Sequence, residues 1–200
     1  MTWRKAGAMA FGALLSVADA DAGRAAEDAV RRPKVPFTGD LIVKRPGERP
    51  VRIRLHYGVT RLRMDVPWPE PRVATVIDRL RRKAVVLLPR RREFVTLPAG
   101  AHAGAMADRL ISARGGLEPL GPDRIGGIAV TRFALKTRTA AGTAFEGHVW
   151  LTDDNIMIRT AGRTPKGPVD IILHNLRRGA IDPALFAIPP GYTERKAGGR

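Results

Sequence analysis

The chain has 200 residues, enough for one domain with a hydrophobic core of ordinary size. It contains no cysteine, which excludes a disulfide framework, a thiolate nucleophile, a cysteine-ligated metal and a lipid-modified N-terminal cysteine. Its 35 Lys and Arg residues outnumber its 19 Asp and Glu residues, for a formal net charge of +16. Such a charge favours a polyanionic partner: nucleic acid, anionic lipid head groups, lipopolysaccharide or an acidic protein surface.

The N-terminus has the pattern of a secretory signal peptide. Arg4 and Lys5 precede an apolar stretch at 6–17, and an apolar region of roughly 7 to 15 residues is typical of such peptides. Two small-x-small patterns follow, which predict cleavage after Ala20 or Ala22. The stretch is too short for a membrane-spanning helix, which needs about 20 apolar residues. We therefore predict a secreted protein of the bacterial periplasm.

The mature chain is predicted to be one domain, residues 23–200, after removal of a signal peptide at 1–22. The removed segment carries two positive and two negative charges, so the mature chain keeps its charge of +16. The basic character therefore belongs to the mature protein. Because a nucleic-acid-binding protein of the cytosol would not carry this leader, we predict no nucleic-acid partner.

The first half of the mature chain has the pattern of a short helix followed by strands. The helix is predicted at 22–32, and Pro33 and Pro36 end it. Beyond them, apolar residues recur at every second position, most clearly at 51–57, which is the pattern of a half-buried antiparallel strand. Strands are predicted at 37–44, 51–57, 61–66, 73–78, 84–88 and 93–97.

The second half adds one helix and four longer strands. Apolar residues at near-helical spacing predict a helix at 103–113, ended by Gly115 and Gly116. Residues 117–125 are predicted to form a loop, and residues 153–155 a tight hairpin turn. The strands are predicted at 128–138, 145–152, 156–161 and 168–176.

These elements predict a mainly β fold with some α-helix, of the α+β class. About ten short strands at regular spacing would form a strongly curved antiparallel sheet or open half-barrel. The two short helices would cover the mouth of this half-barrel. The pattern is typical of a binding scaffold and does not by itself indicate a reaction.

The C-terminal segment 175–192 is predicted to end the last strand and to close one end of the sheet. Gly179 permits a turn that most residues resist. Asp182 is placed to cap a short helical turn, and Pro183 suits the first position of that turn. A small apolar plug is predicted to follow, made of Leu185, Phe186 and Ile188.

With these motifs in order, the chain resembles the periplasmic lipoprotein-carrier superfamily, the fold of LolA, LolB and the sensor RseB. Within it, the chain is most similar to small secreted proteins of unknown function. The resemblance implies an unclosed barrel whose concave face is apolar and accepts acyl chains. It rests on the motifs at 37–41, 51–66, 148–154, 176–186 and 189–192.

An enzymatic function is not predicted, because the sequence offers no catalytic constellation. Its two serines are Ser16, in the signal peptide, and Ser112, in the predicted helix. His148 and His174 could each share a strand face with a nearby carboxylate, but polar residues on the outer face of a sheet explain them better. No metal or cofactor site is predicted.

The predicted ligand site is an apolar concavity. Alternating apolar side chains from several strands could line one face, and a cavity left unfilled would favour alkyl chains. An ordinary packed core is the alternative, and Trp68, between two prolines, would lie at the rim. The predicted lining residues are Val51, Ile53, Leu55, Leu62, Met64, Trp68, Phe133, Leu135, Trp150, Ile156, Ile158, Ile171 and Leu173.

A second predicted feature is an anion-binding rim of arginines in two neighbouring turns, at opposite ends of one hairpin strand. A guanidinium group can hold phosphate or carboxylate through two parallel N–H groups, whereas solvated turn charge is the alternative interpretation. The rim residues are Arg79, Arg81, Arg82, Arg90, Arg91 and Arg92.

Two functions fit these features. The first is a non-catalytic periplasmic carrier that transports a lipid, an acylated ligand or another hydrophobic group in its concavity. The arginine turns would then hold the ligand's anionic head, an acidic envelope protein or an anionic membrane surface. The second is an envelope interaction or sensor module, whose filled sheet docks an acidic partner through the basic surface.

Overall fold

The structure, a computed structural model, describes residues 32–66, 73–98, 116–138, 144–165 and 167–196. The predicted helix at 103–113 lies outside these residues, as do all but the last residue of the predicted helix at 22–32. The predicted signal peptide and Trp68 lie outside them as well.

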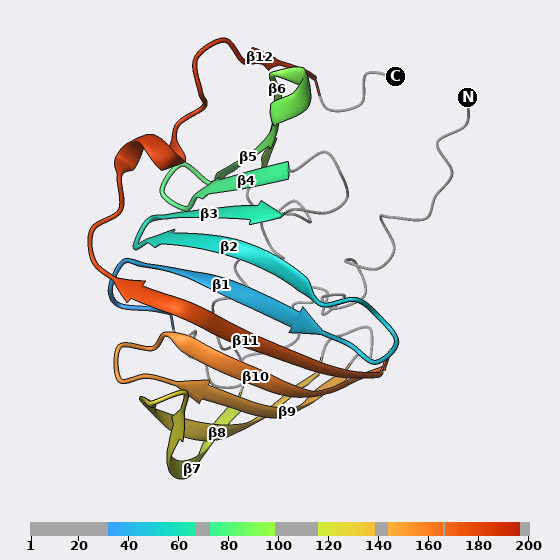
Figure 1. Ribbon diagram of the computed structural model, residues 1–200, viewed down its shortest axis with the longest axis vertical. Helices are drawn as coiled ribbons and strands as arrows, with labels where there is room; N and C mark the ends of the chain where they lie inside the picture. The colour runs from blue at the N-terminus through green and yellow to red at the C-terminus, as the bar shows by residue number, and fades with distance from the viewer. Residues whose placement is uncertain (1–31, 67–72, 99–115, 139–143, 166, 197–200) are drawn as a thin grey trace, which may run out of the picture. The chain divides into compact units, whose positions relative to one another are not determined.

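The described residues form a mainly β fold (Figure 1). Its first six strands are β1 (Phe37–Lys44), β2 (Val51–Gly58), β3 (Arg61–Val66), β4 (Val73–Asp78), β5 (Lys83–Leu88) and β6 (Glu93–Pro98). The other six are β7 (Gly116–Ile125), β8 (Ile128–Arg138), β9 (Ala144–Leu151), β10 (Met157–Thr164), β11 (Gly167–Arg178) and β12 (Thr193–Glu194). Two short 3-10 turns are η1 (Pro89–Arg91) and η2 (Pro183–Phe186).

The strands form one open sheet, because the order of neighbours is linear: β12-β6-β5-β4-β3-β2-β1-β11-β10-β9-β8-β7. The hairpin pairs are antiparallel, whereas β12 pairs with β6 in parallel. The predicted open, mainly antiparallel sheet is therefore confirmed, with twelve strands where about ten were predicted. The predicted cover of short helices is not confirmed, because the described part of the chain contains no α-helix.

The prediction of a loop at 117–125 is wrong, because this segment belongs to strand β7, which pairs with β8. Pro119 and Pro122 lack an N–H group, and this lack is tolerated here because β7 is an edge strand at one end of the strand order. The register shifts between Pro119 and Gly121, which marks a bulge. Prolines and a glycine therefore gave an edge strand the appearance of a loop.

Contacts divide the described residues into two compact units. Unit 1 contains residues 43–49 and 116–172, and unit 2 contains residues 33–42, 50–98 and 173–196. In unit 2, strands β2 to β6 lie side by side in chain order (Figure 1). The single domain predicted at 23–200 stays a prediction.

Unit 2 has an apolar face and a polar face. On β2, Ile53, Leu55 and Tyr57 are buried, while Arg52, Arg54 and His56 alternate with them and are more exposed, as the sequence pattern predicts. The register places Leu55 opposite Met64 and Tyr57 opposite Leu62, so β3 continues the same two faces. The apolar face of unit 2 is thus made of Ile53, Leu55, Tyr57, Leu62 and Met64, and the polar face is its reverse.

A buried carboxylate connects three strands of unit 2. The side chain of Asp40 on β1 is 3% exposed, and its Oδ2 accepts hydrogen bonds from Arg52 Nη2 at 2.8 Å and Arg54 Nη1 at 3.0 Å. Asn175 on β11 donates a third bond from Nδ2 at 2.7 Å, from a left-handed backbone conformation. Burial alone would raise the pKa of Asp40, but the bonds from Arg52, Asn175 and Arg54 outweigh it and hold the pKa well below its ordinary value of 3.8.

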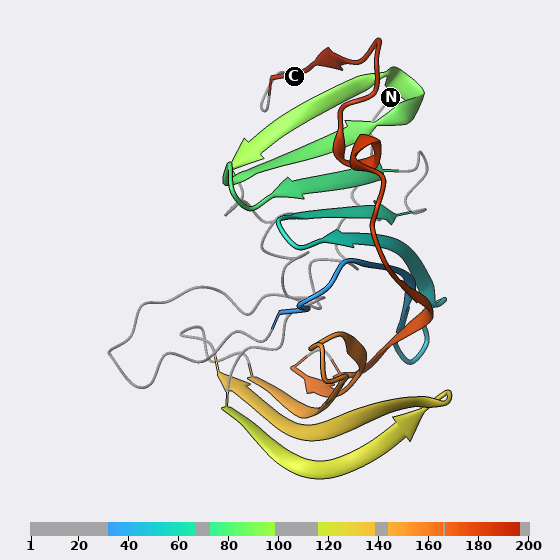
Figure 2. The same ribbon diagram turned by 90° about the vertical axis from the view of Figure 1, so that its left-hand side faces the viewer.

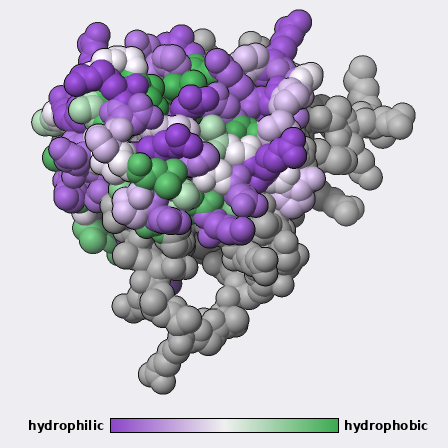
Figure 3. Space-filling view, turned by 90° about the horizontal axis from the view of Figure 1, so that it is seen from below, coloured by the Kyte–Doolittle hydropathy of each residue, from purple (hydrophilic) through white to green (hydrophobic). Residues whose placement is uncertain are grey.

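Unit 1 is built on long, bent strands (Figure 2). Its core cluster consists of Phe133, Leu135, Val149, Leu151 and Met157. Where β9 and β10 pair, Gly147 faces Gly162, and a Cβ atom added to either residue would lie within 2.4 Å of the backbone of the other strand. Such close approach leaves no room for a side chain at these two positions. In the view of Figure 3, hydrophobic patches are separated by hydrophilic side chains.

We predict that Asp40→Asn lowers the free energy of unfolding at neutral pH by about 2–3 kcal/mol, because two cations lose their buried counter-charge. The value lies at the low end for a buried ion pair because Arg52 and Arg54 are 63% and 42% exposed. Urea denaturation measures the change. Glu48→Gln is the matched control, because the side chain of Glu48 is 46% exposed in its ion pair with Arg45 and the loss of this pair should cost under about 1 kcal/mol.

The same variant should change the pH dependence of stability. The pKa of Asp40 is lower in the folded protein than its ordinary value of 3.8, so the unfolded chain binds more protons in acid. This contribution to stability is therefore present above pH 3.8 and is lost as the pH falls below it. Equal acid sensitivity of the wild type and Asp40→Asn would contradict the account.

Candidate functional site

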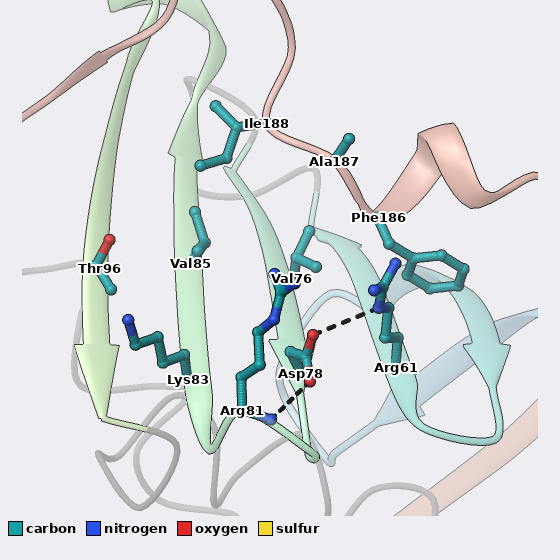
Figure 4. A pocket seen from close by; sticks show the side chains of 10 residues that line it. All are labelled: Arg61, Val76, Asp78, Arg81, Lys83, Val85, Thr96, Phe186, Ala187 and Ile188. Atoms are coloured by element: carbon teal, nitrogen blue, oxygen red, sulfur yellow. Dashed lines mark hydrogen bonds and ion pairs between the residues drawn. The ribbon is translucent and has the colours of Figure 1, made fainter.

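A groove of about 390 Å³ lies on the polar face of unit 2, between the sheet and the C-terminal tail (Figure 4). Strands β3 to β6 and the turn after β4 form one side of this tail groove, and the last residue of η2 with the two residues after it forms the other. Its lining residues are Arg61, Val76, Asp78, Arg81, Lys83, Val85, Thr96, Phe186, Ala187 and Ile188.

Strand register explains why the sheet residues of the groove share one face. Asp78 pairs with Arg61 on one side and with Lys83 on the other, and Val76 pairs with Val85. The run 73–77 is almost continuously apolar, and β4 is buried on both of its faces. Because β4 has an apolar side on the polar face of unit 2, that side needs a cover.

The tail supplies this cover. Asp182 accepts a hydrogen bond from the backbone N–H of Ala184 at 2.9 Å, and Pro183 begins η2, so the predicted cap of a short helical turn is confirmed. Phe186, at the end of η2, packs against a buried cluster on the sheet. That cluster consists of Ala74, Val76 and Leu87.

A polar link holds the tail beside its apolar contact. Arg63 on β3 donates from Nη1 to the backbone carbonyl of Leu185 at 2.9 Å, and its Nε and Nη2 contact Asp65 at 2.9 Å and 2.8 Å. Burial would raise the pKa of Asp65, but hydrogen bonds from His56 and Arg63 outweigh it, and the pKa lies below its ordinary value. Asp65 therefore stays charged and orients the guanidinium group toward the tail.

The tail then adds a strand that the sequence did not predict. In β12, Thr193 donates from its backbone N–H to the carbonyl of Arg92 at 2.9 Å, and Arg195 donates to that of Phe94 at 2.8 Å. Thr96 Oγ1 donates to Glu194 Oε1 at 2.6 Å. These bonds fix the far end of the tail along the edge of β6.

The groove combines positive charge with an apolar surface. Arg61 Nε lies 3.4 Å from Asp78 Oδ2, and Asp78 Oδ1 also accepts a hydrogen bond from the backbone N–H of Arg81 at 2.9 Å. Of the three cations that line the groove, Arg61, Arg81 and Lys83, Arg61 therefore forms an ion pair with Asp78, the one carboxylate of the lining. In Figure 4 the side chain of Arg81 extends toward Val76 and that of Arg61 lies beside Phe186, so charged and apolar groups adjoin in the groove. Such a surface can hold an anionic group together with an apolar one.

The predicted lining residues of unit 2 lie away from the tail groove. Ile53, Leu55, Leu62 and Met64 are on the apolar face and are at most 3% exposed. Leu173 is buried and Val51 is half-buried. These side chains pack as a core would, and ligand binding by them stays a prediction.

In unit 1, the register places most of the predicted residues on one side but not Trp150. Phe133 pairs with Val149 in the strand register, Val149 pairs with Thr160, and Thr160 pairs with Ile171. Phe133 and Ile171 therefore share a face of the sheet. Trp150 follows Val149 and therefore points to the opposite face. Further predicted residues of this unit, Leu135, Ile156 and Ile158, are buried.

Trp150 lies instead in a row of charged side chains. The guanidinium groups of Arg132 and Arg159, its neighbours on β8 and β10, lie 5.6 Å and 5.2 Å from its ring. Its Nε1 donates to Asp123 Oδ2 at 2.8 Å. Trp150 is only 8% exposed, so this arrangement stabilises the sheet through cation–π contacts and does not present the ring to a ligand.

The predicted arginine rim is divided by strand β5. Residues 79–82 precede this strand and η1 follows it, so the two turns lie at opposite ends, as predicted. Six residues of strand span about 20 Å, which is too far for one head group. Arg81 lines the tail groove, whereas Arg79 lies 5.1 Å from the ring of Tyr57 and donates to the carbonyl of Val59 at 3.2 Å.

Metal-binding clusters and membrane-spanning helices are both absent from the described ranges. Those residues contain no group of three or more His, Asp or Glu side chains placed to bind a metal ion. They also contain no helix with the length and apolar character needed to cross a membrane.

Solved structures share the fold of this chain. An uncharacterized conserved protein from Thermus thermophilus is 16% identical, with 82% of this chain and 91% of that chain covered and a TM-score of 0.57. MucB, solved in complex with MucA(peri), is 15% identical, with 78% and 55% covered and a TM-score of 0.50, so the chain matches about half of MucB. The LolA superfamily protein NE2245 from Nitrosomonas europaea is 11% identical, with 80% and 94% covered and a TM-score of 0.41.

The likenesses to the Thermus thermophilus protein and to MucB are of fold only, and at that level the predicted resemblance is confirmed. No family model matches the sequence, and no curated protein does. The tail groove was not predicted from the sequence. Two signals for it were present: the apolar run at 73–77, because a strand that is apolar on both faces needs a second cover, and the predicted apolar plug that supplies Phe186 and Ile188.

We predict that Phe186→Ala loosens the tail and lowers the free energy of unfolding by about 2 kcal/mol, because a half-buried aromatic contact is lost. Thermal melting and the rate of tryptic cleavage after Arg178 measure the change. Ile188→Ala is the control, since Ile188 is 40% exposed and should contribute under about 0.5 kcal/mol. An unchanged cleavage rate in Phe186→Ala would contradict the role of Phe186 in holding the tail.

Proposed function

We propose that this protein is a non-catalytic binding protein of the bacterial envelope that carries a lipid or another anionic amphiphile. The observation that carries the proposal is the tail groove, in which an apolar surface and three cations meet. Its volume of about 390 Å³ lies within the roughly 300–1,000 Å³ of small-molecule pockets. A single acyl chain with an acidic head is the simplest ligand of this shape.

The charged and the apolar side chains of the groove would contact different parts of the ligand. A carboxylate or phosphate head would contact Arg81 and Lys83, because both side chains are exposed and their charge exceeds that of Asp78. The apolar chain would lie on Val76 and Val85, under Ile188.

The compartment follows from the sequence. The N-terminal pattern at 1–22 is that of a signal peptide, so we place the mature protein in the periplasm. An amphiphile released or taken up at a membrane must cross this aqueous space. A binding protein that covers its acyl chain would make that crossing favourable.

Dodecanoate tests the proposal as a minimal anionic amphiphile. We expect the mature protein to bind it, and to bind dodecyltrimethylammonium, which has the same chain and a cationic head, at least tenfold more weakly. The double variant Arg81→Gln, Lys83→Gln should weaken dodecanoate binding about tenfold, because each exposed charge contributes up to about 1 kcal/mol. Isothermal titration calorimetry below the micelle concentration measures these affinities.

The control is the double variant Arg90→Gln, Arg91→Gln, which removes the same charge at the other end of β5. It should leave the affinity for dodecanoate unchanged. Ile188→Glu should abolish binding, because it places a carboxylate on the exposed wall of the groove. Equal losses of dodecanoate affinity in the two double variants that remove charge would show a general charge effect and would contradict a site in the groove.

The alternative function is an envelope interaction module that docks an acidic protein. The net charge of +16 favours it, and MucB, which shares the fold, was solved in complex with MucA(peri). Such a contact should weaken steeply with ionic strength, because exposed charges are screened within about 10 Å at 0.1 M salt. Pull-downs from periplasmic extract over a salt series test this, and capture that does not depend on salt would count against it.

A further inference from the structure

Two exposed apolar side chains lie on adjacent turns of unit 2. Leu80, in the turn between β4 and β5, is 78% exposed, and Val59, in the turn between β2 and β3, is 51% exposed. Scattered surface apolar residues are ordinary, but two together at the tips of neighbouring turns are a feature to explain.

The structure holds these two turns together. The backbone N–H of Arg79 donates to the carbonyl of Thr60 at 3.0 Å, and its guanidinium group donates to the carbonyl of Val59 at 3.2 Å. Within the second turn, Asp78 accepts a hydrogen bond from the backbone N–H of Arg81. Val59 and Leu80 therefore belong to one surface, which we call the turn tip.

Cations surround the turn tip. Arg81, Arg82 and Lys83 follow Leu80 directly and are exposed, and Arg61 follows the turn that carries Val59. With Arg79, five cations lie in these two turns or at the strand ends next to them, against the single carboxylate of Asp78. Exposed apolar side chains with cations next to them are complementary to an anionic bilayer, because the apolar side chains enter the interface and the cations contact the head groups.

We propose that the turn tip docks on a membrane surface that contains anionic lipid. An acidic protein would satisfy the cations, but it would not account for the exposed Leu80 and Val59 beside them. Arg61, Arg81 and Lys83 also line the tail groove, so the docked protein would hold the basic end of the groove at the membrane surface. The bilayer contact does not depend on the ligand of the groove, and each is measured separately.

Sedimentation with phospholipid vesicles tests the proposal. We expect the mature protein to bind vesicles of phosphatidylcholine and phosphatidylglycerol, and to bind pure phosphatidylcholine vesicles far more weakly. The double variant Val59→Ser, Leu80→Ser should bind the mixed vesicles at least tenfold more weakly, because two inserted apolar groups are lost. Arg81→Gln with Arg82→Gln should weaken binding roughly twentyfold at low salt.

Two matched controls address position. Leu120→Ser removes a 48% exposed leucine from β7, in the other unit, and should leave vesicle binding unchanged. Arg90→Gln with Arg91→Gln removes equal charge from the far end of β5. Wild-type binding by Val59→Ser, Leu80→Ser, or equal losses in the two arginine pairs, would overturn the turn tip. No binding to any vesicle, with capture of an acidic protein instead, would also overturn it.

Discussion

A hydrogen bond from Arg63 joins the near end of the C-terminal tail to the sheet of unit 2, beside the tail groove. Arg63 contacts Asp65 through one part of its guanidinium group and donates to the carbonyl of Leu185 through another. Burial would raise the pKa of Asp65, but hydrogen bonds from His56 and Arg63 outweigh this effect and lower the pKa, so its carboxylate stays charged to a lower pH than that of an ordinary aspartate. Phe186, next in the chain, then covers the apolar side of β4. The Arg63 link and the packing of Phe186 hold the near end of the tail over the groove, and the bonds of β12 hold its far end.

Much of the fold could be predicted because alternation is a local property. The two faces of β2 and the capping of η2 by Asp182 follow from a few neighbouring residues, and both are confirmed. Strand β7 could not be predicted in the same way, since Pro119 and Pro122 argue against a strand unless the strand lies at an edge. Whether a strand is an edge strand depends on the order of the whole sheet.

The site was harder to predict because it depends on register between distant segments. A one-residue difference in register moves a side chain to the other face of the sheet. Phe133 pairs with Val149, so Trp150, the next residue, points to the face that Phe133 does not occupy. The groove needs β4 to meet a tail that is about 100 residues away in the chain. Apolar residues at 73–77 indicate that a cover exists, and the predicted apolar plug after Asp182 indicates a segment that needs a surface, but no local pattern pairs the two.

Native mass spectrometry of the mature protein, purified from a bacterial periplasm without detergent, tests the central claim most directly. The account predicts an adduct with the mass of an anionic amphiphile, released by organic extraction and absent from the Ile188→Glu variant. A protein that is always empty, and that takes up neither dodecanoate nor added phospholipid, would contradict the carrier function. The basic surface would then have to serve a protein partner.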